Sequence, residues 1–478
     1  MEASKALVSK EDIKKLLDVE KLKYCFECGI CTASCSIADL LGKDYNPRSL
    51  LEKVFLNPDA VLTSYEPWLC AWCYRCHKHC PQGLKLPEIF LYIRTVAVKN
   101  AFTQPLEIAL EKIVDNIPLP IVTTLVCFHP ERAGLDTKKI LDMIENIRTE
   151  RLRKAKKRKI VKSSGEKIAV IGSGPAGLTV ASELAKKGHK VTIFEAFSEP
   201  GGMLRKCIPE YRLPKRVLAK EIRLIEDLGV EIKTGVKVGK DVSFDDLRKG
   251  NYKAVFIGVG ANKSQTFKIE GGDLEGVAHA IEFLWNANCK EKVEVGKDVI
   301  VIGGGNVAMD AAKTALRFGA DKVTVLYRRS KEEMPAIPWE VKEAENEGVK
   351  IEFLVAPKKI LGKNGKVSAV ECIRMQLGEP DESGRRKPIP IEDSEFTRET
   401  DIVILAVGEA PDLGFLPKEV ELNEDGTIWI DPITMETSIE GVFAGGDAVI
   451  GPATVIEAIW AGKRAAESIE NYVKSLAR

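Results

Sequence analysis

The stretch Lys167-Ile-Ala-Val-Ile-Gly-Ser-Gly-Pro-Ala-Gly177 decides the fold of the larger part of this 478-residue chain. An apolar run typical of a buried parallel strand leads into a glycine-rich turn, and a helix is expected over 175–188. Gly172 permits the tight turn, Gly174 lets the backbone approach a pyrophosphate, and Gly177 lets the helix pack closely on the sheet. The stretch therefore predicts a dinucleotide-binding unit that offers free N–H groups of a helix start to phosphate.

The residue after the next strand indicates which dinucleotide is bound. The strand is expected over 191–194, and Glu195 follows it directly. A carboxylate at this place suits the hydroxyl pair of a ribose and would repel a 2′-phosphate. The first unit is thus predicted to take FAD or NAD.

A second unit repeats the order of strand, glycine turn and helix. Gly303-x-Gly305-x-x-Ala308 follows the strand 299–302, and the next strand, 323–327, ends before Arg328 and Arg329. Two guanidinium groups at a strand end match a 2′-phosphate through charge-assisted hydrogen bonds. This unit is predicted to prefer NADP(H); the alternative is that both arginines simply face solvent.

Strand-like runs on both sides of the second unit indicate that it is inserted into the first. The segment 254–257 precedes it, a matching run at 402–408 follows it, and Gly441 to Asp447 closes the pattern. Asp447 could accept a hydrogen bond from a ribityl hydroxyl of a flavin. A helix expected over 452–461 would direct its N-terminal dipole to the flavin ring.

Eight of the twelve cysteines fall into two copies of one spacing, Cys25-x2-Cys28-x2-Cys31-x3-Cys35 and Cys70-x2-Cys73-x2-Cys76-x3-Cys80-Pro81. This spacing is typical of two-cluster ferredoxins, in which the fourth cysteine of each run ligates the other cluster. One 4Fe–4S cluster is therefore expected on Cys25, Cys28, Cys31 and Cys80, and the other on Cys35, Cys70, Cys73 and Cys76. Structural zinc is the alternative, but it uses two cysteine pairs rather than two quartets.

The predicted fold class is α/β, with two nested Rossmann-like nucleotide-binding domains (FAD outer, NADP inserted) after a mainly α-helical dicluster ferredoxin-like domain. Helices are expected over 47–56 and 87–98. The predicted domains are a two-cluster domain (1–105), a helical connector (106–165), the FAD domain (166–290 and 398–478) and the NAD(P)H domain (291–397). The basic run 148–162 at the end of the connector is interpreted as a solvated linker, with docking of an acidic partner as the alternative.

Composition sets wider limits. The formal net charge is +1, which gives no indication of nucleic-acid binding. No apolar window is long enough for a membrane span, and the first residues do not resemble a signal peptide. Ferredoxin-type cysteines need reduced thiols, so a cytoplasmic location is expected.

Several longer motifs resemble the glutamate synthase small-subunit family, which includes the large subunit of NADH-dependent ferredoxin:NADP oxidoreductase and the N-terminal half of dihydropyrimidine dehydrogenase. The motifs lie at 172–177, 199–204, 208–215, 303–310, 327–329, 333–336 and 444–448. The resemblance implies FAD in the outer domain and NADP(H) in the inserted one. The residues expected at FAD are Gly172, Gly174, Pro175, Ala176, Gly177, Glu195, Gly202, Met203, Leu204, Arg212, Gly260, Gly446, Asp447, Thr454 and Val455. Those expected at NADP(H) are Gly303, Gly304, Gly305, Asn306, Val307, Arg328 and Arg329.

The N-terminal module departs from that family and is similar, over about 15–100, to the small iron–sulfur subunit of heterodisulfide reductases. A second departure is Cys207, at a position where the family commonly has glycine. Cys207 is a candidate redox thiol beside the flavin, although inert packing is the preferred interpretation. Cys127, Cys289 and Cys372 are expected to be buried.

Together these features predict an NADPH-linked flavin and iron–sulfur oxidoreductase subunit. It would pass electrons between NAD(P)H, FAD and two 4Fe–4S clusters, to or from a partner subunit of a larger, conceivably electron-bifurcating complex. Candidate partners are other oxidoreductase subunits, a glutamate synthase large subunit, or a ferredoxin. One alternative is a pyridine-nucleotide:disulfide or sulfur reductase, for which 165–478 lacks a vicinal cysteine pair. Another is a non-catalytic electron-relay subunit.

Overall fold

The computed structural model describes residues 8, 11, 13, 25, 28–155, 165–265, 267–289, 293, 295–381 and 384–476. The chain divides into two compact units. Unit 1 comprises 1–201, 215–259 and 413–478, and unit 2 comprises 202–214 and 260–412. Among the described residues, no helix combines the length and the apolar character that crossing a membrane requires.

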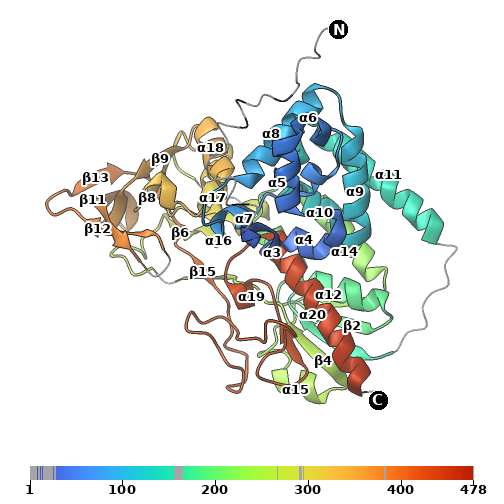
Figure 1. Ribbon diagram of the computed structural model, residues 1–478. Coiled ribbons are helices and arrows are strands. Elements are labelled where there is room, and N and C mark those ends of the chain that lie inside the picture. Colours follow the sequence, from blue (N-terminus) through green and yellow to red (C-terminus); the bar gives the residue numbers. More distant parts are fainter. Residues whose placement is uncertain are drawn as a thin grey trace, which may run out of the picture. The chain divides into compact units, whose positions relative to one another are not determined.

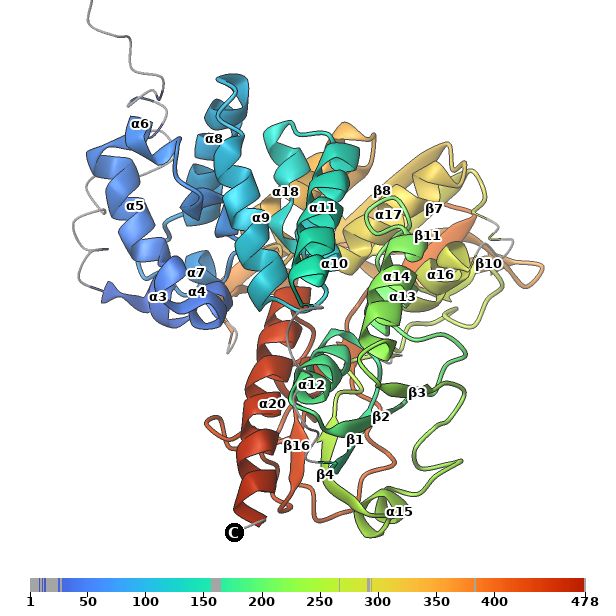
Figure 2. The same cartoon turned by 90° about the vertical axis from the view of Figure 1, so that its right-hand side faces the viewer.

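Unit 1 contains a five-stranded parallel sheet in the order β16-β4-β1-β2-β3. Its strands are β1 (Lys167–Ile171), β2 (Lys190–Phe194), β3 (Glu231–Lys233), β4 (Tyr252–Ile257) and β16 (Val442–Ala444). Helix α12 (Pro175–Lys186) joins β1 to β2, and α20 (Val455–Leu476) packs along it (Figure 2). Helices α14 (Lys215–Glu226), α15 (Phe244–Lys249) and α19 (Asp447–Ile450) complete this part. The strand, turn and helix predicted around the first glycine motif are therefore confirmed.

The N-terminal part of unit 1 is helical, as predicted. Its helices are α3 (Ile30–Ala33), α4 (Ser36–Leu41), α5 (Pro47–Leu56), α6 (Pro58–Val61), α7 (Arg75–Lys78), α8 (Leu86–Lys99), α9 (Gln104–Asn116), α10 (Pro120–Thr123) and α11 (Thr137–Ala155), with short turns η1 (Gly42–Asp44), η2 (Glu66–Leu69), η3 (Thr124–Phe128) and η4 (Pro130–Ala133). Helices α3, α4 and α7 gather near the first turns of α20 (Figure 1), and α4 contacts α20 directly.

The basic run at the end of the connector is only partly described, because 156–164 lie outside the described residues. Arg148 forms an ion pair with the buried carboxylate of Glu221, and Arg151 contacts Asp115 at 2.9 Å. These two arginines thus pair with carboxylates of their own unit, which favours the linker interpretation over a docking patch.

Unit 2 repeats the same sheet architecture in the order β6-β14-β7-β8-β9, again with parallel strands. The strands are β6 (Val277–His279), β7 (Asp298–Ile302), β8 (Lys322–Tyr327), β9 (Lys350–Phe353) and β14 (Ile402–Leu405). An antiparallel sheet of β10 (Val355–Lys363), β11 (Lys366–Pro380), β12 (Arg386–Pro390) and β13 (Phe396–Glu399) and the pair β5 (Lys263–Ser264) and β15 (Glu409–Ala410) are added to it. The helical elements are α13 (Met203–Lys206), α16 (Ala280–Asn288), α17 (Asn306–Arg317), η5 (Lys331–Glu333) and α18 (Pro338–Asn346).

The boundaries of unit 2 differ from those predicted for the inserted domain, 291–397. The chain was expected to re-enter the FAD domain at 398, which would place β14 in that domain. The structure instead places β14 between β6 and β7 of the second sheet. Both sheets accept an apolar parallel strand, so composition alone does not indicate which sheet a run joins. The segment 202–214 also belongs to unit 2 rather than to the outer domain.

Candidate cofactor and cluster sites

The three glycines of the first motif meet different requirements. A Cβ added at Gly172 would lie 2.6 Å from the carbonyl oxygen of Gly258, and one added at Gly177 would lie 2.0 Å from that of Gly172. At Gly174 the nearest atom would be 4.0 Å away, so the protein itself leaves this position open. Gly174 is the N-cap residue of helix α12, and no side chain caps the helix there. The open glycine and the uncapped N–H groups are what a pyrophosphate needs.

Glu195 is fixed beside this turn by hydrogen bonds. Its Oε2 accepts from the backbone N–H of Ser173 at 3.0 Å and from the Ser173 hydroxyl, and its Oε1 accepts from the N–H of Phe197 at 2.9 Å. The side chain is buried, and carboxylate oxygens have lone pairs beyond those used here. Its remaining lone pairs could accept from ribose hydroxyls, and the FAD contact of Glu195 stays a prediction.

The C-terminal part of the predicted FAD site lies in the same unit. A Cβ added at Gly446 would lie 3.1 Å from Cβ of Ala176, so glycine allows this loop to approach the start of α12. Thr454 donates from its backbone N–H and its hydroxyl to Oε2 of Glu457, at 3.0 and 2.6 Å, which caps α20. Unit 1 thus brings Gly446, Asp447, Thr454 and Val455 together with the first glycine motif.

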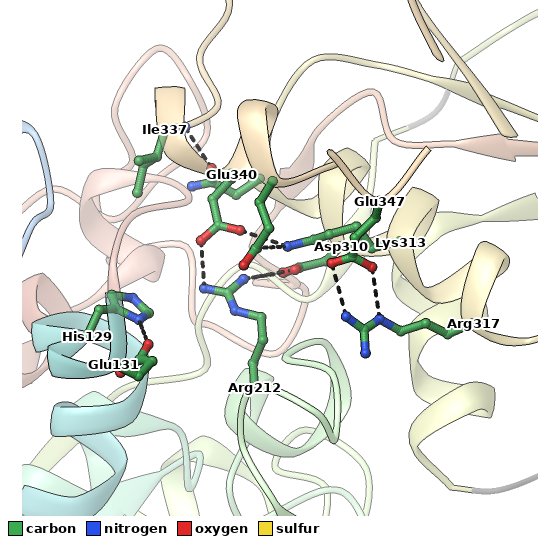
Figure 3. Close-up of polar contacts among 11 residues, drawn as sticks. His129, Glu131, Arg212, Asp310, Lys313, Arg317, Ile337, Glu340 and Glu347 are labelled. Carbon is green, nitrogen blue, oxygen red and sulfur yellow. Dashed lines mark hydrogen bonds and ion pairs between the residues drawn. The ribbon is translucent and has the colours of Figure 1, made fainter. Parts of the chain in front are cut away.

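Five predicted FAD residues lie in unit 2 instead: Gly202, Met203, Leu204, Arg212 and Gly260. Arg212 is bound within that unit by a buried ion network (Figure 3). Its Nη1 donates to both carboxylate oxygens of Asp310, at 2.8 and 2.7 Å, and its Nη2 lies 3.3 Å from Glu340. Lys313 donates to the same Glu340 at 3.0 Å. The network fastens 202–214 to α17 and α18, and the FAD contact of Arg212 remains a prediction.

Charge in this network is balanced despite its burial. The side chain of Lys313 is fully buried and that of Glu340 is 2% exposed. Burial lowers the pKa of Lys313, but Glu340 and Asp310 more than offset this effect, so that the pKa lies above its ordinary value. These shifts favour the charged form of Lys313, whereas burial raises the pKa of Asp310 above its ordinary value although Arg212 opposes the shift.

The second glycine motif has the same division of roles as the first. A Cβ at Gly303 would lie 2.1 Å from the carbonyl oxygen of Ala406, and one at Gly304 would lie 2.4 Å from the ring of Tyr327. Nothing lies within 4 Å of a Cβ at Gly305, which precedes α17 without a side-chain cap. The open position again falls where a pyrophosphate is predicted.

A loop after β8 supports this turn. The N–H of Ala336 donates to the carbonyl of Gly304 at 3.0 Å, and that of Ile337 donates to Oδ1 of Asn306 at 2.9 Å. The Tyr327 hydroxyl donates to the carbonyl of Glu333 at 2.7 Å. Asn306, predicted at NADP(H), thus helps to hold the turn through its side chain.

The two arginines after β8 are not equivalent. Arg329 is buried, with Nη2 2.5 Å from Asp381 and Nε donating to the carbonyl of Arg386 at 2.8 Å. Arg328 is exposed, and no ion pair of its side chain is found within the described part of unit 2. Of the two guanidinium groups predicted for the 2′-phosphate, Arg328 is therefore the one available to a ligand.

The first cysteine set surrounds a cavity. The cavity is lined by Cys25, Cys28, Cys31 and Cys80, together with Gly29, Ile30, Pro81, Gln82 and Leu86. Burial, with the neighbouring Cys80, Cys31 and Cys28, raises the pKa of Cys25 to about 12. Such a thiol becomes a thiolate only when a metal compensates for its charge. Cys28 is exposed, so this site reaches the surface of unit 1.

The second set also converges and is more deeply buried. Burial raises the pKa of Cys35 to about 12, with a further contribution from Cys70. Burial raises the pKa of Cys76 as well, and Cys70, Cys73 and Cys35 add to that shift. The two groupings proposed from the spacing, with Cys80 and Cys35 exchanged between runs, are those that the structure brings together.

A direct contact joins the second set to α20. Arg75, between Cys73 and Cys76, donates to Oε1 of Glu457 at 2.6 Å. The indole N–H of Trp460 donates to Asp39 at 2.5 Å one turn further along the helix. Neither pair was anticipated from the sequence, since each joins residues hundreds of positions apart.

The remaining cysteines do not form a redox pair in the structure. Cys207 is 8% exposed within an apolar cluster of unit 2, which favours the packing interpretation. Cys127 and Cys372 are buried as expected. The prediction for Cys289 is wrong, because this thiol is exposed at the C-terminal end of α16.

Family models match both parts of the chain. One described as pyridine nucleotide-disulphide oxidoreductase matches 166–462, and one described as a 4Fe-4S dicluster domain matches 21–84. These matches confirm the predicted cofactor set of FAD, NADP(H) and two 4Fe–4S clusters and the oxidoreductase class, and they favour iron–sulfur over zinc.

Curated relatives cover different shares of the chain. The NADP(+)-dependent formate dehydrogenase subunit beta of Moorella thermoacetica is 49% identical over 315 residues, 65% of this chain and 44% of that protein. The NADPH-Fe(3+) oxidoreductase subunit beta of Geobacter sulfurreducens is 38% identical over 440 residues, 84% of this chain and 63% of its own length. The NADPH glutamate synthase small chain of Escherichia coli is 40% identical over 333 residues, 66% of this chain and 70% of that one. The chain thus spans less than two thirds of the first two relatives.

Solved structures confirm the fold. FprA from Mycobacterium tuberculosis in complex with NADPH is 22% identical with a TM-score of 0.54, over 66% of this chain and 85% of that one. Thioredoxin reductase from T. acidophilum is 24% identical with a TM-score of 0.50, over 65% of this chain and 98% of that one.

Proposed function

Because the chain belongs to the pyridine nucleotide-disulphide oxidoreductase family and carries a 4Fe–4S dicluster domain, we propose that it is the NADP(H)-linked subunit of a larger redox enzyme. It would pass electrons between NADP(H) and a partner subunit. Support comes from relatives named as subunits of formate dehydrogenase and of an NADPH-Fe(3+) oxidoreductase, and as a glutamate synthase small chain. The reaction of the complete enzyme would be decided by that partner.

When bound, the flavin exchanges hydride with the nicotinamide and the clusters carry single electrons. The uncapped start of α12 would bind the FAD pyrophosphate at Gly174, and Glu195 would bind the ribose. The start of α20, at Thr454 and Val455, would direct its dipole toward the ring, with the N–H of Thr454 itself already donated to Glu457. In unit 2, the corresponding groups for NADP(H) are the start of α17 and the guanidinium of Arg328.

The ion pair between Arg75 and Glu457 carries the proposed order of electron transfer. It attaches the loop between Cys73 and Cys76 to the first turn of α20, the predicted flavin end. The set Cys35, Cys70, Cys73 and Cys76 would therefore come next to the flavin. The set that includes the exposed Cys28 would come next to the partner, since it reaches the surface.

The partner would be another oxidoreductase subunit, and a ferredoxin is a further candidate. We also propose a cytoplasmic location, because eight cysteines can bind iron–sulfur clusters only where thiols stay reduced. Electron bifurcation would need a partner that supplies a second acceptor.

The test is rapid mixing of anaerobically prepared full-length chain with NADPH, followed by flavin and cluster absorbance. We expect flavin bleaching and then cluster reduction. Arg75→Glu should slow the second phase and leave the first unchanged, and Arg75→Glu with Glu457→Arg should restore it in part. Lys53→Glu is the matched control, because it reverses the charge of an exposed lysine that forms an ion pair with Glu66 in the same module. An absence of flavin bleaching would support the relay alternative, and unchanged cluster reduction in Arg75→Glu would overturn the proposed order.

A further inference from the structure

Arg94 is a cation in the interior of unit 1 with only neutral hydrogen-bond acceptors. It is 1% exposed, on an otherwise largely apolar face of α8. Its Nε donates to the carbonyl of Pro67 at 2.8 Å, Nη1 to that of Phe128 at 2.7 Å and Nη2 to that of Cys70 at 2.7 Å. The face of Trp68 lies 5.6 Å from the guanidinium carbon. All the groups that bind the guanidinium are thus uncharged.

A buried charge without a counter-ion costs several kcal/mol, so an anion is expected near Arg94. Within the described residues, Arg94 forms no ion pair with a carboxylate. Glu131 lies in the surroundings but is bound to His129 at 2.9 Å, and the like charge of Arg132 opposes its effect. The nearest anionic group by contact is therefore Cys70, once its thiol is a cluster ligand.

Tyr45 converges on the same ligand. Its side chain is 2% exposed, and its hydroxyl lies beside the Cys70 thiol, where each group shifts the pKa of the other. One cluster ligand thus has a hydroxyl beside its sulfur and a guanidinium at its carbonyl. Both groups favour negative charge at this site.

The other cysteine set has a different environment. The charged groups that act on Cys25 are Cys80, Cys31 and Cys28. The ligands of this set have neutral neighbours: the hydroxyl and the backbone N–H of Thr32 lie beside the Cys31 thiol, and the Cys80 sulfur accepts from the N–H of Leu84 at 3.4 Å. Arg48 lies beside the turn at Gly29 but is only partly buried, so water screens its charge. A fully buried cation therefore distinguishes the second set from the first.

We propose that Arg94 and Tyr45 raise the reduction potential of the cluster on Cys35, Cys70, Cys73 and Cys76. Reduction adds one electron to a group that is already anionic, and burial without compensation opposes this step. A nearby cation and a hydrogen bond to a ligand sulfur favour the reduced form. They let a deeply buried cluster accept an electron. The inference rests on the proposed function only in placing this cluster next to the flavin.

The experiment is an anaerobic dithionite titration of the full-length chain, followed by electron paramagnetic resonance and accompanied by iron analysis. Tyr45→Phe removes one hydroxyl, Arg94→Gln removes the charge, and Arg94→Lys keeps it. In Tyr45→Phe and Arg94→Gln, the ratio of reduced to oxidised cluster at a fixed potential should fall about tenfold, or about 59 mV for a one-electron couple. Arg94→Lys should stay near the parent, and the signal of the other cluster should not move.

Arg48→Gln is the matched control, since it removes an arginine near the first set and should leave the potential of the second set unchanged. If Arg94→Gln loses iron, the reduction potentials of Tyr45→Phe and Arg94→Lys still test the proposal. Unchanged potentials in iron-replete Tyr45→Phe and Arg94→Gln would overturn the proposal. So would an equal fall in Arg94→Lys, because the charge would then not be the cause. Dithionite supplies the electrons without NADPH, so failure of the proposed function would be seen separately.

Discussion

Replacing Arg328 and Arg329 by alanine, one at a time, should separate nucleotide recognition from support of the site. Arg329 is buried and bound to Asp381 and to the carbonyl of Arg386, whereas Arg328 is exposed at the end of β8. Only Arg328 has its guanidinium available for a 2′-phosphate. The two substitutions should therefore differ in kind, although the residues are neighbours in the chain.

The magnitude follows from the bonds that each arginine makes. A hydrogen bond to a charged group contributes about 1.5–3 kcal/mol. Arg328→Ala should therefore weaken NADPH binding roughly 10- to 150-fold and leave NADH binding unchanged. Arg329→Ala removes the ion pair with Asp381 and the hydrogen bond to the carbonyl of Arg386, and should lower stability by about 1–3 kcal/mol. Its effect on the two nucleotides should be equal.

The assay is titration calorimetry of the FAD-loaded chain with NADPH and with NADH, paired with thermal unfolding. Lys363→Ala is the matched control, since this exposed lysine ends β10, at the opposite end of β11 from the strand β12. An equal loss of both nucleotides in Arg328→Ala would refute the reasoning. A selective loss of NADPH in Arg329→Ala would refute it as well.

Three further outcomes are expected. Gly174→Ala should lower the FAD content without changing the melting temperature of the apoprotein, because the nearest atom to its Cβ is 4.0 Å away. Gly177→Ala should destabilise the apoprotein, because its Cβ would lie 2.0 Å from the carbonyl oxygen of Gly172. The FAD content and the melting curve of each variant measure these effects. Arg212→Met should destabilise unit 2 by about 3–5 kcal/mol, since it removes the ion-pair partner of the buried Asp310, whereas Glu340 keeps Lys313. Lys366→Ala at an exposed ion pair should cost at most about 1 kcal/mol in the same denaturation assay. Alkylation of the native chain should modify Cys289 and spare the other cysteines of unit 2, and peptide mass spectrometry locates the modified thiol. If alkylation of Cys289 abolished turnover with a disulfide reagent, the disulfide reductase alternative would be favoured over an electron-transfer subunit.

Elements determined by local interactions could be predicted closely. Strand β1 has the predicted bounds, and α5 begins at Pro47 because the side chain of Asn46 accepts from the N–H groups of Arg48 and Ser49, both at 3.1 Å. Three ligands of each cysteine set likewise follow from short spacing within one loop, whereas the fourth, Cys80 or Cys35, comes from the other run. In these cases the residues that decide the structure are neighbours in the chain.

Features that depend on distant partners could not be predicted. The partner of Arg329 is Asp381, on a hairpin with no recognised motif, and that of Arg212 is Asp310, 98 positions away. The sequence of β14 suits either sheet, and the structure pairs this strand with β6 and β7 of the second one. Arg94 within the largely apolar run 86–98 is the sequence signal for a buried charge near the clusters.

The backbone passes between the two units four times, at 201/202, 214/215, 259/260 and 412/413. While the chain emerges from the ribosome, β4 therefore has no neighbour on one side until all of unit 2 has been made and β16 arrives. An unpaired strand edge of this kind can associate with other chains. The helix that carries Glu457 and Trp460 is also made after unit 2, so the iron–sulfur module gains these attachments only at a late stage of biogenesis.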